Sequence, residues 1–161
     1  MEECARELAA RLLAKVIKRT PVGDYSREIE VTAQRDSKYH KKGDTYKKKV
    51  NPSGKKGGTL RRGWTSRSQE EAEGGKGRPT AQEAKEYAES LEIQKEGGVY
   101  QVEVINPVEY ASYVEYGHRT ASHKGWVPGQ FMLMVSEREL QEIAPKVLEA
   151  KIKKFLTEVM K

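Results

Sequence analysis

One strongly basic segment divides this sequence and limits where an apolar core can form. Residues 35–62 carry eleven Lys or Arg side chains against two aspartates, although the whole chain has a net charge of only +6. From residue 35 to 58, Lys, Gly, Asn and Pro replace nearly all apolar residues. Such a composition buries too little apolar surface to offset the entropy that ordering costs. We therefore predict a single domain over residues 1–161 with a mobile basic insertion at about 33–58.

A long helix is predicted at each end of the chain. Residues 2–19 repeat apolar side chains at helical spacing, with cationic residues on the other face. Thr20-Pro21 should end this helix, because the residue before a proline is disfavoured in the helical conformation. The last thirty or so residues keep the same 3.6-residue period. Pro145 lies inside this second pattern and is expected to kink or split the helix.

Shorter patterns between the two helices predict strands and brief helices. Thr80 and Glu83 have the spacing of a capping box, which predicts a helix that reaches about Ser90. Alternating residues on both sides of a glycine-containing turn in residues 91–104 predict a β-hairpin, and the alternation at 27–34 predicts another short strand. The segment "EYASYVEYG" has the spacing of one short helix, with Tyr110, Tyr113 and Val114 on one face and Glu115 on another.

These elements together predict an α+β fold. A small antiparallel β-sheet should pack with the long N-terminal helix and the long, proline-kinked C-terminal helix. On this interpretation the core includes Leu12, Val16, Tyr100, Val102, Tyr110, Tyr113 and Phe131. The chain is 36% hydrophobic, below the ~45–50% that is usual for globular proteins, so the core should be small or completed by neighbouring subunits.

No pattern for catalysis, metal binding or a cofactor stands out. Cys4 lies on the apolar side of the first helix, where a single thiol acts as a small buried hydrophobe. Glu115, His118 and His123 can be imagined as metal ligands, but their spacing matches no established zinc pattern. No apolar run is long enough to span a membrane, and no secretory signal is present. We predict no catalytic residue, no metal, no cofactor, no small-molecule substrate and no membrane contact.

The lysines of the basic insertion leave two interpretations open. They could be a solvated or assembly-contact loop, or they could contact nucleic acid with strongly salt-dependent affinity. Tyr39, His40 and Tyr46 lie among them as possible base-stacking platforms, but no established nucleic-acid-binding signature accompanies them. The candidate contact residues for nucleic acid or another partner are Lys41, Lys42, Lys47, Lys48, Lys49, Lys55 and Lys56.

Four segments occur in an order that resembles a known family. They are "TPVG", "GGTLRRGWT", "NPVEYASYVEYGHRT" and "GWVPGQFML", followed by the terminal helix. They resemble the tailed-bacteriophage head–tail connection family, in particular its branch in contractile-tailed phages and defective prophages. The resemblance covers the chain from about Thr20 to its end. Residues 24–56 interrupt a pattern that is usually contiguous in the family, so the basic segment is an insertion about which the resemblance implies little.

The resemblance implies a non-enzymatic neck protein that acts in tail completion or as a tail terminator. Such a protein forms a ring, expected to be hexameric, that joins the tail to the filled head in the host cytoplasm and then stays in the virion. Its partners would be other copies of itself, the tail tube, neighbouring neck proteins and the DNA that passes through the neck. The implied assembly residues are Arg61, Arg62, Trp64, Glu115, His118 and Arg119.

Three alternatives stay open beside this interpretation. The two arginines of "LRRGW" could simply be solvated, with the tryptophan in the core. The whole chain could be a basic nucleic-acid-binding module. An enzyme, such as a metal-dependent nuclease, ranks third, because no cluster of carboxylates has ligand spacing.

Overall fold

The computed structural model describes residues 1–55 and 57–160, which divide into two compact units. Unit 1 comprises Met1–Pro21 and Gly58–Lys161, and unit 2 comprises Val22–Gly57. Unit 2 is thus inserted between the first helix and the rest of unit 1. It begins earlier than the insertion predicted at 33–58, because it includes the strand expected near residue 27. The mobility of this insertion stays a prediction.

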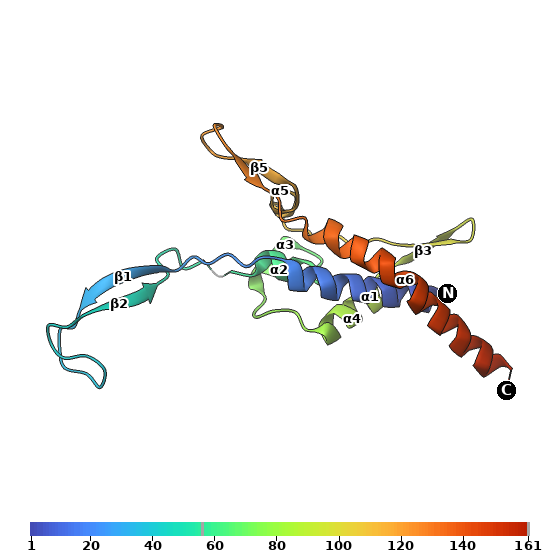
Figure 1. The fold of residues 1–161 in the computed structure, drawn as a ribbon, viewed down its shortest axis with the longest axis horizontal. Coiled ribbons are helices and arrows are strands. Elements are labelled where there is room, and N and C mark those ends of the chain that lie inside the picture. The colour runs from blue at the N-terminus through green and yellow to red at the C-terminus, as the bar shows by residue number, and fades with distance from the viewer. Residues whose placement is uncertain (56, 161) are drawn as a thin grey trace. The chain divides into compact units, whose positions relative to one another are not determined.

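Helix α1 (Glu2–Arg19) is central to unit 1. It packs against α4 (Ala81–Ser90) and α6 (Met132–Val159), as Figure 1 shows. The predictions for α1 and α4 are confirmed, and so is the capping box at the start of α4: Thr80 Oγ1 accepts from Glu83 N at 3.1 Å and Glu83 Oε2 accepts from Thr80 N at 2.6 Å. Helix α6 continues through Pro145, so the expected split does not occur.

Two short helices lie on either side of Trp64, in a part of the chain where no sequence pattern indicated a helix. Helix α2 (Thr59–Gly63) contains both arginines of the "LRRGW" segment. Helix α3 (Gln69–Gly74) begins at Ser68, whose side chain accepts a hydrogen bond from Glu71 N. The two helices pack against each other, and α2 also contacts α1. This part of the chain therefore belongs to the folded unit 1.

The strands form three separate antiparallel pairs within the described part of the chain. Strands β3 (Ile93–Glu96) and β4 (Val99–Val102) confirm the predicted hairpin; Gly97 and Gly98 both have positive φ at its turn, as a type I′ turn requires. Strands β5 (Gly117–Arg119) and β6 (Trp126–Pro128) form another antiparallel pair, which no sequence pattern indicated. The α+β class is confirmed, with three hairpins in place of one sheet.

Unit 2 contains the third pair, β1 (Arg27–Thr32) and β2 (Thr45–Val50). The prediction of an irregular loop from 35 to 58 is therefore wrong for the second of these strands. Two cross-strand pairs explain why a lysine-rich strand forms. Glu28 lies opposite Lys49 and Glu30 lies opposite Lys47, and opposite charges in such positions stabilise an antiparallel ladder.

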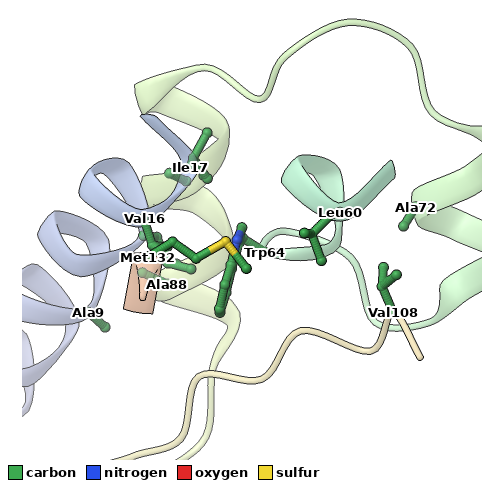
Figure 2. Packing of buried hydrophobic residues seen from close by; sticks show 11 residues of the cluster. Ala9, Val16, Ile17, Leu60, Trp64, Ala72, Ala88, Val108 and Met132 are labelled. Carbon is green, nitrogen blue, oxygen red and sulfur yellow. The ribbon is translucent and has the colours of Figure 1, made fainter. Parts of the chain in front are cut away.

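The core of unit 1 forms where α1, α2, α4 and the start of α6 meet (Figure 2). Leu13, Val16 and Ile17 of α1 are almost completely buried, and they pack with Trp64 and Met132. Small residues complete this cluster, among them Ala9 of α1 and Ala84 and Ala88 of α4. Alanines allow the helices to approach closely, so a chain with few large apolar residues still forms a continuous core.

The predicted core residues fall into three groups. Val16 is buried, whereas Leu12, Tyr100 and Val102 are only half-buried. Tyr110, Tyr113 and Phe131 are exposed, so their assignment to the core is wrong for the isolated chain. The buried stripe of α1 is centred on Leu13, one position beyond the predicted one. The tyrosines face outward because Glu115 occupies the inward face of their helix.

Ion pairs hold α6 along α1. Glu139 contacts Lys15 at 2.8 Å and also binds Arg19. Nearer the C-terminus, Lys151 contacts Glu3 and Glu7. Hydrogen bonds from Lys15 and Arg19 lower the pKa of the Glu139 carboxyl below its usual range.

These ion pairs predict acid sensitivity of the α1–α6 contact. A carboxyl whose pKa is lowered in the folded state contributes stability above its unfolded pKa, which is about 4.3 for glutamate, and loses it as pH falls through the lowered value. We expect Glu139→Gln to lower the melting temperature at pH 7, and we expect this effect to shrink as the pH falls below about 4.3 and through the lowered pKa. Thermal unfolding followed by circular dichroism measures this. Glu142→Gln, at an exposed position of the same helix outside these pairs, is the control; an equal shift in both variants would contradict the prediction.

Candidate assembly surface

The two arginines predicted for an interface bind backbone carbonyls within unit 1. Arg61 donates to Thr20 O from Nε at 3.0 Å and also from Nη2. Arg62 donates from Nε to Ala72 O at 2.7 Å, and only 7% of this residue is exposed. The pair therefore connects α2 to the end of α1 and to α3. An interface role for these arginines stays a prediction, but the alternative of two solvated arginines is wrong for Arg62.

Trp64 lies beneath the arginines and shares one of their partners. Its Nε1 donates to Thr20 Oγ1 at 2.8 Å, and that hydroxyl donates to Val16 O at 2.7 Å. Trp64 is 3% exposed and belongs to the cluster drawn in Figure 2. One threonine at the end of α1 thus accepts hydrogen bonds from an arginine through its carbonyl and from the tryptophan through its hydroxyl. This geometry explains why the "TP" and "LRRGW" segments act together although unit 2 separates them in sequence.

Asn106 connects the same region to the segment before α5 (Ala111–Tyr116). Its Nδ2 donates to Leu60 O at 2.8 Å, and its Oδ1 accepts from Val108 N at 3.2 Å. A Cβ at Gly63 would lie 2.2 Å from Asn106 Oδ1, so only glycine fits there. The sequence patterns did not single out Asn106. The glycine between the arginine pair and Trp64 was the available signal for a close approach.

Glu115 has a role different from the predicted surface role. It is 5% exposed, and its carboxylate accepts hydrogen bonds from Leu133 N at 2.9 Å and Met134 N at 3.0 Å. These two N–H groups lie in the first turn of α6, where helix donors have no partner within the helix and where the helix dipole favours a negative charge. Glu115 of α5 therefore caps the N-terminus of α6.

Two glycines allow the chain to pass close to this cap. Gly117 has a φ of 87°, and a Cβ there would lie 2.5 Å from Val127 O. A Cβ at Gly129 would lie 2.2 Å from Glu115 O. The backbone of Gln130 donates to Val114 O at 2.8 Å, which closes the joint from the other side. The glycines of the "VEYG" and "VPGQF" segments are thus explained by the close crossing of two chain segments next to the β5–β6 hairpin.

An exposed apolar surface is formed by residues of the segments that meet at this joint, namely α5, β6 and the start of α6. We call it the arm surface; it consists of Tyr113, Tyr116, Trp126, Val127, Phe131 and Met134, all of which are exposed. The predicted interface residues His118 and Arg119 are exposed on the same hairpin. His118 lies opposite Val127 and its ring is 5.9 Å from that of Tyr113, whereas Arg119 lies opposite Trp126. Both faces of the hairpin therefore combine a cation or histidine with a large apolar residue.

A second exposed apolar stripe occupies the end of α6. Ile152, Phe155, Leu156 and Val159 follow one another at i, i+3, i+4 and i+7, and all four are exposed. They come after Lys151, whose ammonium group is bound by Glu3 and Glu7 at the start of α1. The predicted helical period is correct here, but unit 1 leaves its apolar side uncovered.

The lysines predicted to contact nucleic acid or another partner lie in unit 2. Lys41, Lys42, Lys47, Lys48, Lys49 and Lys55 are exposed, and Lys56 lies outside the described residues. Within the described residues, no group of three or more His, Cys, Asp and Glu side chains is placed to hold a metal ion. No helix in that part of the chain is both long and apolar enough to cross a membrane.

The fold and its surfaces define a small α+β protein with an exposed aromatic arm. Residues 1–117 match the model of the HK97-gp10-like family, described as "Bacteriophage HK97-gp10, putative tail-component". The match spans more than half of the chain, so the protein belongs to this family of structural phage tail components. It includes α2, Trp64 and Glu115 but ends before β6. No curated protein and no solved structure matches the chain.

Proposed function

We propose that this tail component acts at the head–tail junction, in tail completion or as a tail terminator, by assembling into a ring at the head-proximal end of the tail. The observation that carries the proposal is the arm surface. Large contiguous apolar surfaces on a soluble subunit mark contacts with other proteins. Interface hot spots are enriched in Trp, Tyr and Arg; the arm surface presents Trp126 and two tyrosines, and Arg119 is exposed on the same hairpin.

The two exposed apolar surfaces of unit 1 also support a ring in preference to a two-fold dimer. A ring needs heterologous contacts, in which one surface of a subunit meets a different surface of the next. The arm surface and the end of α6 are two such different surfaces. Their combination supplies one contact on each side of a subunit, with the tail tube and neighbouring neck proteins as further partners. The expected copy number is six, with assembly in the host cytoplasm before incorporation into the virion.

On this proposal the motif residues of unit 1 divide into two roles. His118 and Arg119 would contact the neighbouring subunit directly. Arg62, Trp64 and Glu115 would act indirectly, because they hold the helices that present the arm. Nothing in this mechanism needs a catalytic residue, since the work is done by binding alone.

We expect Trp126→Ala to leave a folded protein that no longer completes tails. Trp126 is 61% exposed, so its removal should change the free energy of unfolding by less than about 0.5 kcal/mol. Loss of an interface hot spot costs about 2 kcal/mol or more at each contact, and a ring repeats that loss. The measurement is complementation of a phage or prophage that lacks this gene, counted as infectious particles and filled heads joined to tails.

The matched control is Val99→Ala, which removes an exposed apolar side chain at the β3–β4 turn, away from the arm. This variant should complement as well as the unaltered protein. Circular dichroism and thermal unfolding verify that both variants fold. Full complementation by a folded Trp126→Ala protein would contradict the proposed role of the arm.

A further inference from the structure

Nearly all of the protein's net charge belongs to unit 2. By sequence, residues 22–57 contain ten Lys or Arg residues and five Asp or Glu residues, a net charge of +5 out of the total of +6. In the described part of this unit, no cationic side chain lies within 4 Å of a carboxylate oxygen, whereas unit 1 has eight such pairs among its described residues. The charge of unit 2 is therefore concentrated and not compensated by close ion pairs.

The aspartates of the hairpin tip, which we define as residues 35–44, bind backbone and not lysine side chains. Asp36 Oδ1 accepts from Lys42 N at 2.7 Å, and Asp44 Oδ2 accepts from Lys41 N at 2.8 Å. These bonds fold the tip into turns and occupy one oxygen of each carboxylate. The ammonium groups of Lys38, Lys41 and Lys42 remain outside on exposed side chains.

Two lysines of the run in β2 lie opposite glutamates of β1, although neither forms an ion pair within 4 Å among the described residues. Residues opposite each other in an antiparallel ladder share a face, so Lys47 lies beside Glu30 and Lys49 beside Glu28. Lys48 is on the other face, opposite Ile29. The run of three lysines is the most conspicuous basic feature of the sequence, but the register gives two of them an acidic neighbour.

The tip also carries an uncovered aromatic ring. Tyr39 is 80% exposed, with Lys38 Nζ 5.6 Å from the centre of its ring. His40 instead stacks on Tyr46 of β2, with ring centres 4.0 Å apart and planes 7° apart. That stacking fixes the tip to the hairpin, and it leaves the lysines and Tyr39 directed to solvent.

We propose that the hairpin tip, through Lys38, Lys41 and Lys42, binds the phosphate backbone of nucleic acid. Phosphates take lysine as a point-charge partner without further apolar contact. Protein interfaces, in contrast, are depleted in lysine and enriched in buried aromatic and apolar residues, so the tip is a poor match for a protein partner. This binding is separate from ring assembly, because the arm surface and the end of α6 belong to unit 1.

The test is fluorescence anisotropy of the full-length protein with a short duplex DNA and a single strand of the same sequence, at several salt concentrations. The tip variant is Lys38→Gln with Lys41→Gln and Lys42→Gln. For the unaltered protein we expect a dissociation constant in the micromolar range or below at low salt. Each lost phosphate contact should reduce the slope of log K against log salt by about 0.9 on duplex DNA, so the tip variant should lose about 2–3 in slope. A preference for one probe identifies the form of nucleic acid that is bound.

Two control variants make the result specific to the tip. Lys18→Gln with Lys76→Gln and Lys85→Gln removes the same charge from exposed positions of unit 1 and should leave the slope unchanged. Lys47→Gln with Lys49→Gln removes lysines that face glutamates and should change the slope by less than 1. Thermal unfolding verifies the fold of each variant. Equal slope loss in the tip and unit 1 variants, absence of binding at low salt, or tighter binding to polyglutamate than to DNA would each overturn the proposal.

Discussion

Replacing Trp64 with alanine is expected to lower the free energy of unfolding by about 4 kcal/mol, because buried Phe or Trp to Ala changes typically cost about 3–5. Trp64 is almost fully buried between the short helix α2 and the α1–α4–α6 core. The change also removes the hydrogen bond to Thr20 Oγ1, so that a buried hydroxyl loses one partner. A loss of this size is a large fraction of the 5–15 kcal/mol by which a domain is usually stable.

Urea unfolding followed by circular dichroism measures this loss. The matched control is Tyr113→Ala, which also replaces a large aromatic side chain, but one that is 59% exposed. The control should cost less than about 1 kcal/mol, because little buried surface is lost. If the two variants lost equal stability, Tyr113 would be covered in the folded protein and the tyrosine face of α5 would belong to the core after all.

The parts of the fold that could be predicted from sequence are those with local signals. Helix α1 is indicated by the period of its apolar residues and by Thr20-Pro21 at its end, and α4 is indicated by its capping box. The β3–β4 hairpin is indicated by the two glycines of its turn, which have positive φ in the structure. Each of these signals lies within the element that it defines or directly beside it. Strands β5 and β6 were missed because each has only three residues, too few for an alternation to be recognised.

The errors in the candidate site come from partners that are distant in sequence. The periodicity of "EYASYVEYG" correctly gave a helix but placed the tyrosines inside, since apolar residues usually face a core. The inward position is held by Glu115 because the start of α6, eighteen residues later, presents two backbone N–H groups without helical partners. Composition alone gives no sign of this requirement.

The arginines of "LRRGW" illustrate the same limit. As implied assembly residues, both arginines were expected to pair with acidic groups on the same or an adjacent subunit. In the structure Arg61 and Arg62 bind carbonyls at the ends of α1 and α3, which are helix ends that need donors. A helix C-terminus has unsatisfied carbonyls whether or not an acidic residue is near, so the sequence could indicate the donor but not its acceptor.

We expect Glu115→Ala to lower the free energy of unfolding by about 3 kcal/mol. Two charge-assisted hydrogen bonds are lost, and two partly buried N–H groups at the start of α6 are left without an acceptor, each a cost of about 1–3 kcal/mol that does not simply add. Glu115→Gln should cost about half as much, because its amide oxygen still accepts one bond. Glu109→Ala, an exposed carboxylate just before α5, is the control and should stay within about 0.5 kcal/mol of the unaltered protein.

Urea unfolding gives these free energies, and amide hydrogen exchange gives their location. Exchange should accelerate first at Leu133 and Met134, the two donors to Glu115, and only later along α1. If Glu115→Ala cost no more than Glu109→Ala, the carboxylate would not be what stabilises the start of α6. Because Gly129 and Gln130 pack on the same joint, a loosened cap should also displace the arm surface. Glu115→Ala would then impair tail completion without any contact of Glu115 with a neighbour, and Trp126→Ala is the variant that separates contact from support.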